Sequence, residues 1–297
     1  MSNATRIAKD PAMKKYFATL TAIAGLIALV LAAAPARAAG GDTPHYPIEK
    51  PALESWSFAG FFGRFDSAQL QRGFQVYREV CAGCHGLELI AFRNLTEKGG
   101  PNFSEDEVRA LAAEYDITDG PDQSGEMFER SGVLSDYFPS PFPNDQAAAA
   151  GLGAVPPDLS VITKARGVSR GIQWTLLDFF TQYQEGGADY MHALLTGYSE
   201  PPEDIEVSDG NYYNPYFIAG PSLAMPEPLF DELVTYEDGS PETIDQYSRD
   251  VSAFLMWTAE PHLVERKRIG FQVVIFLFVF ASLLYFSKKR VWASVPH

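Results

Sequence analysis

The sequence predicts an all-α domain followed by one membrane-spanning helix, and two observations lead to this fold class. Apolar side chains recur at helical spacing in several segments, whereas the period-two alternation of strands is hard to find. Residues 269–287 form an uncharged run rich in Phe, Val, Ile and Leu, and at 1.5 Å per residue such a run crosses about 30 Å of hydrocarbon. The predicted helices of the domain cover residues 66–80, 104–115, 158–166, 171–184, 188–196 and 243–259, with long Pro-rich and Gly-rich stretches such as 136–157 and 198–228 between them.

The first 38 residues have the features of a cleaved secretory signal. Four basic side chains precede an uncharged stretch over residues 16–34, and the sequence Ala36-Arg37-Ala38 then matches an A-x-A cleavage site. An uncleaved first membrane helix is the alternative, but the many alanines and the small residues at the exit favour cleavage. We therefore expect an exported domain over residues 39–264.

The C-terminal apolar run predicts a membrane anchor over residues 265–290, with a short cytoplasmic tail at 291–297. Three basic residues flank each end of the run, so the positive-inside count cannot set its orientation. The signal sets it instead, because export places the domain outside the cytoplasmic membrane, on the periplasmic side. Basic clusters at both ends argue against the alternative of a buried core helix.

The chain of 297 residues is acidic, with 23 Lys and Arg against 38 Asp and Glu and a formal net charge of −15. Residues 39–264 alone hold 12 basic and 36 acidic side chains, a net charge of −24. Such a domain repels phosphate backbones, which excludes nucleic acid as a partner. This negative charge either belongs to an ordinary solvated surface or serves to steer a basic partner toward the domain.

The only two cysteines stand in the sequence Cys81-Ala82-Gly83-Cys84-His85, which is the C-x-x-C-H pattern of covalent c-type haem attachment. In that chemistry both thiols add to the haem vinyl groups, and the adjacent imidazole ligates iron. A thioredoxin-like redox pair and half of a zinc site are the alternatives. A zinc site needs further ligands at similar spacing and a thioredoxin motif needs alternating strands and helices, and the sequence shows neither.

The segment before the motif predicts a helix that Asp66 caps. Apolar side chains recur there at helical spacing, with polar residues between them. The helix would end at the cysteines, so that one face can lie against the haem. This face consists of Leu70, Phe74, Tyr77 and Val80.

A second axial ligand for the iron must come from Met, His or Lys, unless the position stays open. Met225 stands in a Pro-rich loop, where the prolines prevent regular structure and leave the side chain presented. Met191 and His192, in the predicted helix 188–196, are the next candidates, and an open position is a further possibility. The sequence favours Met225.

With these features in place, the chain resembles the cytochrome c1 family. The similar blocks follow one order along most of the predicted mature chain, which makes them more specific than the haem motif alone. The blocks are Phe74-Gln75-Val76-Tyr77-Arg78-Glu79-Val80 leading into the haem motif, Pro156-Pro157-Asp158-Leu159-Ser160 through Arg166, Leu194-Leu195-Thr196-Gly197-Tyr198, Asn214-Pro215-Tyr216-Phe217, Ala224-Met225-Pro226, and Phe254-Leu255-Met256-Trp257 through Pro261.

The resemblance implies a class I c-type cytochrome-like haem domain with long loops and one covalently bound haem c. His/Met ligation of the iron favours a high reduction potential. Arg166 and Tyr190 would meet the haem propionates, where a guanidinium makes a charge-assisted contact. The segment 167–187 resembles an insertion seen in bacterial members of the family. The implied haem residues are Cys81, Cys84, His85, Met225, Arg166 and Tyr190.

The resemblance also implies a function in electron transfer. The chain would be a subunit of a membrane quinol:cytochrome c oxidoreductase, beside cytochrome b, and would pass single electrons from a Rieske iron-sulfur protein to a basic cytochrome c. Membrane lipid would surround its anchor, and the chain alone would make or break no substrate bond. A free-standing membrane-anchored shuttle and a haem c subunit of another membrane redox enzyme are the alternatives.

Overall fold

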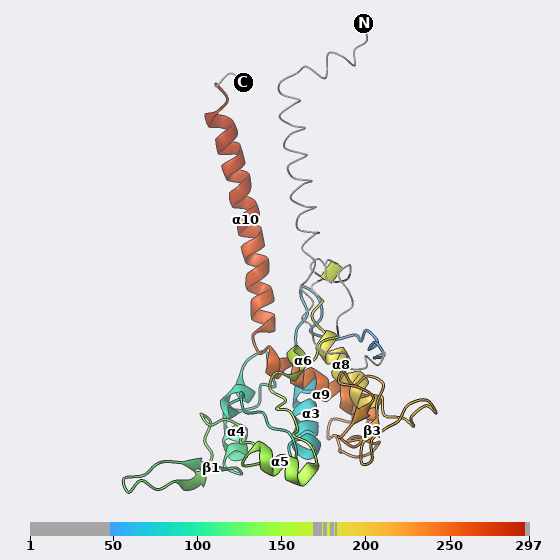
Figure 1. Cartoon of the computed structure of the whole chain (residues 1–297). Helices are drawn as coiled ribbons and strands as arrows, with labels where there is room; N and C mark the ends of the chain where they lie inside the picture. Colours follow the sequence, from blue (N-terminus) through green and yellow to red (C-terminus); the bar gives the residue numbers. More distant parts are fainter. Residues whose placement is uncertain (1–47, 169–173, 175–176, 179–180, 182, 295–297) are drawn as a thin grey trace. The chain divides into compact units, whose positions relative to one another are not determined.

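The computed structural model describes residues 48–168, 174, 177, 178, 181 and 183–294, and helices dominate this part of the chain (Figure 1). The predicted all-α fold class is confirmed. The predicted signal at 1–38 and most of the predicted helix 171–184 lie outside the described residues. The helices of the domain are α3 (Ser67–Val76), α4 (Glu105–Ala112), α5 (Asp145–Leu152), α6 (Ile162–Ala165), α8 (Gly186–Thr196) and α9 (Ile244–Ala259).

Helix α3 begins where the sequence predicts. The Asp66 side chain accepts a hydrogen bond from the Ala68 amide at 3.0 Å and so satisfies one of the free amides of the first turn. The α-helix continues into a π-helical turn, η1 (Tyr77–Cys81), in which the Ala82 amide donates to the Tyr77 carbonyl at 2.8 Å. Single π-helical turns are rare and often occur at functional sites.

Helix α9 is the central element of the core, because it contacts α3, α6 and α8 (Figure 1). The Thr243 side chain caps its first turn by accepting from the Gln246 amide at 3.3 Å. Its closest neighbour is α3, where Gly73 faces the backbone of Asp250: a Cβ on residue 73 would lie 2.1 Å from the Asp250 carbonyl oxygen. Large side chains of α9 that are fully buried are Tyr247, Phe254, Leu255, Met256 and Trp257.

The prediction of a continuous loop over 136–157 is wrong, because α5 occupies residues 145–152. The Asn144 side chain caps this helix by accepting from the Ala147 amide at 2.9 Å, and Gly153 ends it in the left-handed region with φ of 77°. The sequence shows no amphipathic periodicity here because the helix is rich in Ala and buries only Ala148.

Two short antiparallel pairs of strands were not predicted. β1 (Asp116–Asp119) pairs with β2 (Phe128–Ser131), and β3 (Tyr212–Tyr213) pairs with β4 (Ser222–Leu223). The first pair is mostly exposed, so it lacks the alternation of buried and exposed apolar residues by which strands are recognised in a sequence.

The predicted C-terminal apolar helix is confirmed as α10 (Leu263–Val291), which extends beyond the uncharged run at both ends (Figure 1). Its mean hydropathy is 2.4 over the most apolar window. Among the described residues it is the one helix that is long and apolar enough to cross a membrane.

We expect Gly73→Ala to lower the free energy of unfolding by about 1–3 kcal/mol, because the new methyl group forces α3 away from the α9 backbone. Gly151→Ala in α5 is the matched control, since its Cβ would meet nothing closer than 4.0 Å and Ala favours a helix. Denaturant unfolding followed by far-ultraviolet circular dichroism measures both variants. Equal stability of the two variants would contradict the assigned role of Gly73.

Candidate haem site

The two cysteines of the C-x-x-C-H motif lie at the end of the π-helical turn. The Cys84 and His85 amides both donate to the Cys81 carbonyl, at 3.1 and 2.9 Å, so the motif forms a tight turn. Cys81 is half-buried, Cys84 is exposed, and both thiols are free. Burial, and to a lesser degree the neighbouring Cys84, raises the pKa of the Cys81 thiol to about 12. The turn therefore carries two unpaired thiols three residues apart, as attachment to two vinyl groups requires.

His85 is oriented by a segment 72 residues further along the chain. Its Nδ1 lies 2.8 Å from the Pro157 carbonyl oxygen, and because a carbonyl only accepts, Nδ1 carries the proton. This leaves the Nε2 lone pair free to ligate a metal, in the arrangement that metal-bound imidazoles commonly adopt. Burial lowers the pKa of His85, which favours the neutral form that ligation needs, while the Pro157 hydrogen bond and the Asp158 charge act in the opposite direction.

The block around Asp158 also holds the backbone of the motif. The Leu159 amide donates to the Gly86 carbonyl at 2.9 Å. The Asp158 carboxylate accepts from the Glu88 amide at 2.8 Å and from the Ser160 amide at 2.8 Å. These hydrogen bonds join the segment after His85 to the segment before α6.

Met225 follows the short strand β4 and is partly buried against the main hydrophobic core. The Tyr198 hydroxyl, just after α8, donates to the Met225 carbonyl at 3.1 Å and so fixes the loop that carries the side chain. Burial raises the pKa of the Tyr198 hydroxyl above that of an exposed phenol, and the neighbouring Glu227 and Tyr190 raise it to a smaller degree. The hydroxyl therefore keeps its proton and can donate a hydrogen bond. Met225 is thus positioned by a tertiary contact rather than by its own loop alone.

The two rival ligands have other roles in this structure. Met191 is 6% exposed and belongs to the hydrophobic core. His192 is 8% exposed, and its Nε2 lies 3.0 Å from an oxygen of Asp245 while its Nδ1 is 3.9 Å from one of Glu54. Both ring nitrogens of His192 therefore face carboxylates. These surroundings favour Met225 over either rival.

Arg166 and Tyr190, for which the resemblance implies a common role at the haem propionates, interact electrostatically. Burial raises the pKa of Tyr190, which is 2% exposed, whereas a hydrogen bond with the Ile218 backbone and the charge of Arg166 counter that shift. The residue Ile218 belongs to the same long loop as Met225. Tyr190 therefore interacts with Arg166 and with the loop that carries Met225, and the role of the two residues at haem propionates stays a prediction.

Apolar side chains beside the motif and beside Met225 fit a haem. Val80 and Ala82 in and before the motif, and Ile218 and Met225 in the loop 214–228, are each partly buried and pack against the same hydrophobic core. Their remaining exposed surface suits an apolar macrocycle. Within the described part of the chain no three side chains of His, Cys, Asp or Glu come together in a way that could hold a metal ion.

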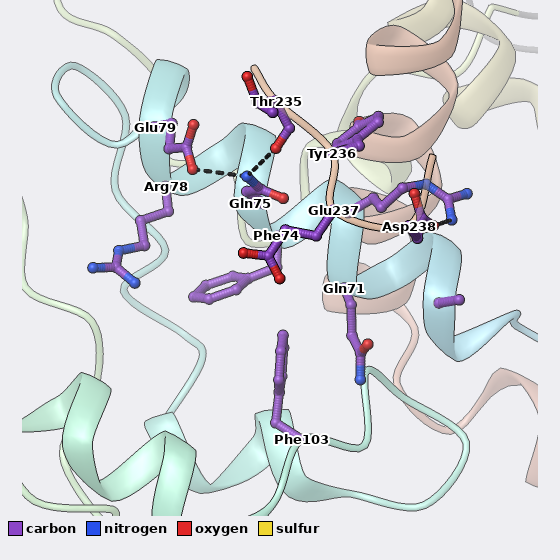
Figure 2. A pocket seen from close by; sticks show the side chains of 12 residues that line it. Gln71, Phe74, Gln75, Arg78, Glu79, Phe103, Thr235, Tyr236, Glu237 and Asp238 are labelled. Carbon is purple, nitrogen blue, oxygen red and sulfur yellow. Dashed lines mark hydrogen bonds and ion pairs between the residues drawn. The ribbon is translucent and has the colours of Figure 1, made fainter. Parts of the chain in front are cut away.

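A groove on α3 lies apart from these residues. Figure 2 shows it between α3, Phe103 and the segment Thr235–Asp238, where the Gln75 side-chain amide donates to Glu79 at 3.0 Å and to the Thr235 carbonyl at 3.2 Å. None of the predicted haem ligands and attachment residues lines this groove, although Phe74, from the helix face expected to lie against the haem, does.

Sequence reasoning missed the roles of Pro157 and Tyr198. Both stand in blocks that resemble the cytochrome c1 family, but one acts through a backbone carbonyl and the other through a hydroxyl that reaches 27 residues along the chain. A backbone acceptor leaves no residue-specific signal in a single sequence. The position of Tyr198 directly after a predicted helix was the one available indication.

Comparison with known proteins gives a consistent result. The model of the Cytochrome C1 family matches residues 56–295. Cytochrome c1 of Blastochloris viridis is 51% identical over 287 residues, which cover 95% of this chain and 96% of that protein. Cytochrome c1 of Rhodospirillum rubrum is 43% identical over 82% of this chain and 88% of that protein. The protein named cytochrome b/c1 of Bradyrhizobium diazoefficiens is 60% identical over 83% of this chain, which spans only 36% of that longer relative.

We expect Met225→Ala to remove the low-spin His/Met signature of the iron and to lower its reduction potential, since a Met ligand raises the potential of a haem. Each 59 mV of one-electron potential corresponds to a tenfold change in the equilibrium constant. Visible and electron paramagnetic resonance spectra with a redox titration measure the effect. Met127→Ala is the control, because Met127 is 59% exposed. An unchanged spectrum in Met225→Ala would contradict the assigned ligand.

Proposed function

Because the chain belongs to the cytochrome c1 family, we propose that it serves as the haem c electron-transfer subunit of a membrane quinol:cytochrome c oxidoreductase. The observation that carries the proposal is the His85 arrangement: a C-x-x-C-H turn whose imidazole has Nδ1 engaged by the Pro157 carbonyl and Nε2 free. A covalently bound haem c supplies reversible one-electron chemistry at such a site.

The chain's own residues bind and tune the cofactor. Cys81 and Cys84 would hold the haem through thioether bonds, and His85 and Met225 would ligate its iron. With both side chains as ligands no coordination site would be left for a substrate, which suits outer-sphere electron transfer. The Tyr198 hydroxyl keeps the Met225 loop in place.

Arg166 and Tyr190 act at the haem propionates. A guanidinium that pairs with a propionate stabilises its negative charge through charge-assisted hydrogen bonds. Tyr190 is buried and interacts electrostatically with Arg166, which supports a shared role of the two side chains. The two side chains therefore orient the haem and contribute to its potential.

The partners follow from the family and from charge. The name of the Bradyrhizobium relative, cytochrome b/c1, covers a cytochrome b in the same polypeptide, which supports a cytochrome b subunit beside this chain. A Rieske iron-sulfur protein donates the electron, and a cytochrome c accepts it. The net charge of −24 over residues 39–264 favours a basic acceptor.

Helix α10 anchors the chain in the membrane. Its orientation follows from the predicted signal at 1–38, which would place the haem domain on the periplasmic side and leave residues 291–297 in the cytoplasm. Membrane lipid surrounds this helix, and the haem domain lies outside the hydrocarbon layer.

We expect b-type haem to co-purify with the C-terminally tagged chain from its native membrane in mild detergent. A dithionite-reduced minus oxidised visible spectrum then shows b-type absorbance beside the covalent c-type band. A free-standing anchored shuttle would give c-type absorbance alone under conditions that keep known complexes intact. That result would contradict the assignment of the chain to a complex, but it would not contradict the proposed haem site.

The charge of the domain also predicts how electron transfer to a basic cytochrome c depends on salt. The Debye length shrinks from about 30 Å at 0.01 M to about 10 Å at 0.1 M ionic strength, so we expect the second-order rate constant to fall about tenfold. Stopped-flow absorbance measures it. An acidic acceptor of similar potential is the control, and its rate should rise with salt. A salt-independent rate with the basic acceptor would show that the acidic surface does not steer it.

A further inference from the structure

The loop 59–64 carries two neighbouring phenylalanines that the haem site does not use. Phe61 is 49% exposed and Phe62 is 76% exposed, whereas Phe58 and Phe65 on either side are buried. Two large exposed rings in succession form an apolar projection on an otherwise acidic domain.

Backbone hydrogen bonds within and beside the loop keep the two rings exposed. The Arg64 amide donates to the Ser57 carbonyl at 2.9 Å, and the Ala59 amide donates to the Trp56 carbonyl at 3.1 Å. The turn is so tight that a Cβ on Gly63 would lie 2.1 Å from the Ala59 carbonyl oxygen. The exposure of the two rings is therefore built into the shape of the loop.

The same loop lies against the first turns of α10. The Lys267 ammonium donates to the Phe58 carbonyl at 2.6 Å. The Phe62 ring packs edge-on against the ring of Phe271, with centroids 5.6 Å apart and an interplanar angle of 74°. Phe271 belongs to the uncharged run 269–287 and lies about 6 Å along the helix from Lys267. Phe62 thus reaches the level at which the apolar run begins.

We propose that Phe61 and Phe62 insert into the interfacial layer of the lipid bilayer where α10 enters it, forming a second contact of the domain with the membrane. A ring that touches the start of a membrane-spanning run meets the same surroundings as that run, and aromatic side chains are favoured at this level. Arg64, two residues after Phe62, and Arg268, three residues before Phe271, are both exposed, and their charges suit lipid phosphates.

Lipid is the occupant that the charges favour. Along α10 the cations at 266–268 precede exposed apolar side chains from Ile269 onward, which is the order of groups that a bilayer presents from headgroup to hydrocarbon. A neighbouring protein subunit over the same rings is the competing occupant, and quenching of a fluorescent label separates the two.

The test uses the full chain with its bound haem and associated subunits, reconstituted into phospholipid vesicles. Phe62→Cys introduces a thiol that an environment-sensitive fluorophore labels, since thioether bonds occupy both native cysteines. Phe128→Cys in β2 is the matched control, because Phe128 is 45% exposed and lies in the hairpin of β1 and β2. Labelling of the unsubstituted chain gives the background and would reveal free native thiols, so a failure of haem attachment is detected separately.

We expect the label at residue 62 to emit at shorter wavelength than the label at 128 and to lose about half of its intensity with lipids brominated near the headgroup, as an interfacial site does. Aqueous iodide should quench the label at 128 and spare the label at 62. Two outcomes overturn the proposal. Quenching of residue 62 by iodide shows a water-exposed loop, and protection from both iodide and brominated lipid shows that protein covers it.

Discussion

Helices α3 and α9 can lie in backbone contact only because residue 73 has no Cβ. This contact joins the two segments on which function depends, since α3 continues into the haem motif and α9 is separated from α10 by three residues. Beside it, the side chain of Asp250 is wholly buried and pairs with Arg72 at 2.8 Å. A buried carboxylate is tolerated only when it is paired, so the ion pair fixes how the helices face one another.

The haem site is assembled from segments that are far apart in the chain. His85 takes its orientation from Pro157, and Met225 takes its position from Tyr198. Neither ligand is held by its local sequence alone, although each stands in a recognisable motif. The long loops of this domain therefore have a structural role, because they carry the groups that orient the ligands.

The features that could be predicted from the sequence are those that depend on neighbouring residues. The capped start of α3 at Asp66, the apolar span of α10 and the C-x-x-C-H turn all depend on residues within a few positions of one another. Helix α5 was missed because an Ala-rich helix with one buried residue has no amphipathic pattern.

Long-range contacts account for the rest of what was missed. The acceptor of the His85 proton is a backbone carbonyl 72 residues away, and nothing in the residue type of Pro157 indicates it. The close approach of Gly73 to Asp250 likewise depends on a pairing of helices 177 residues apart. Resemblance to a family identified the blocks that contain such residues without revealing what each one does.

Ligation by two distant segments, combined with covalent attachment, makes the cofactor a reporter on the fold. In the proposed site, displacement of the Met225 loop would change the coordination of the iron, while the haem would stay bound to Cys81 and Cys84. Unfolding would then release no cofactor into solution, so the midpoint of the transition would not depend on haem concentration, as it does for a dissociable cofactor. Visible absorbance would therefore follow the tertiary structure of this domain.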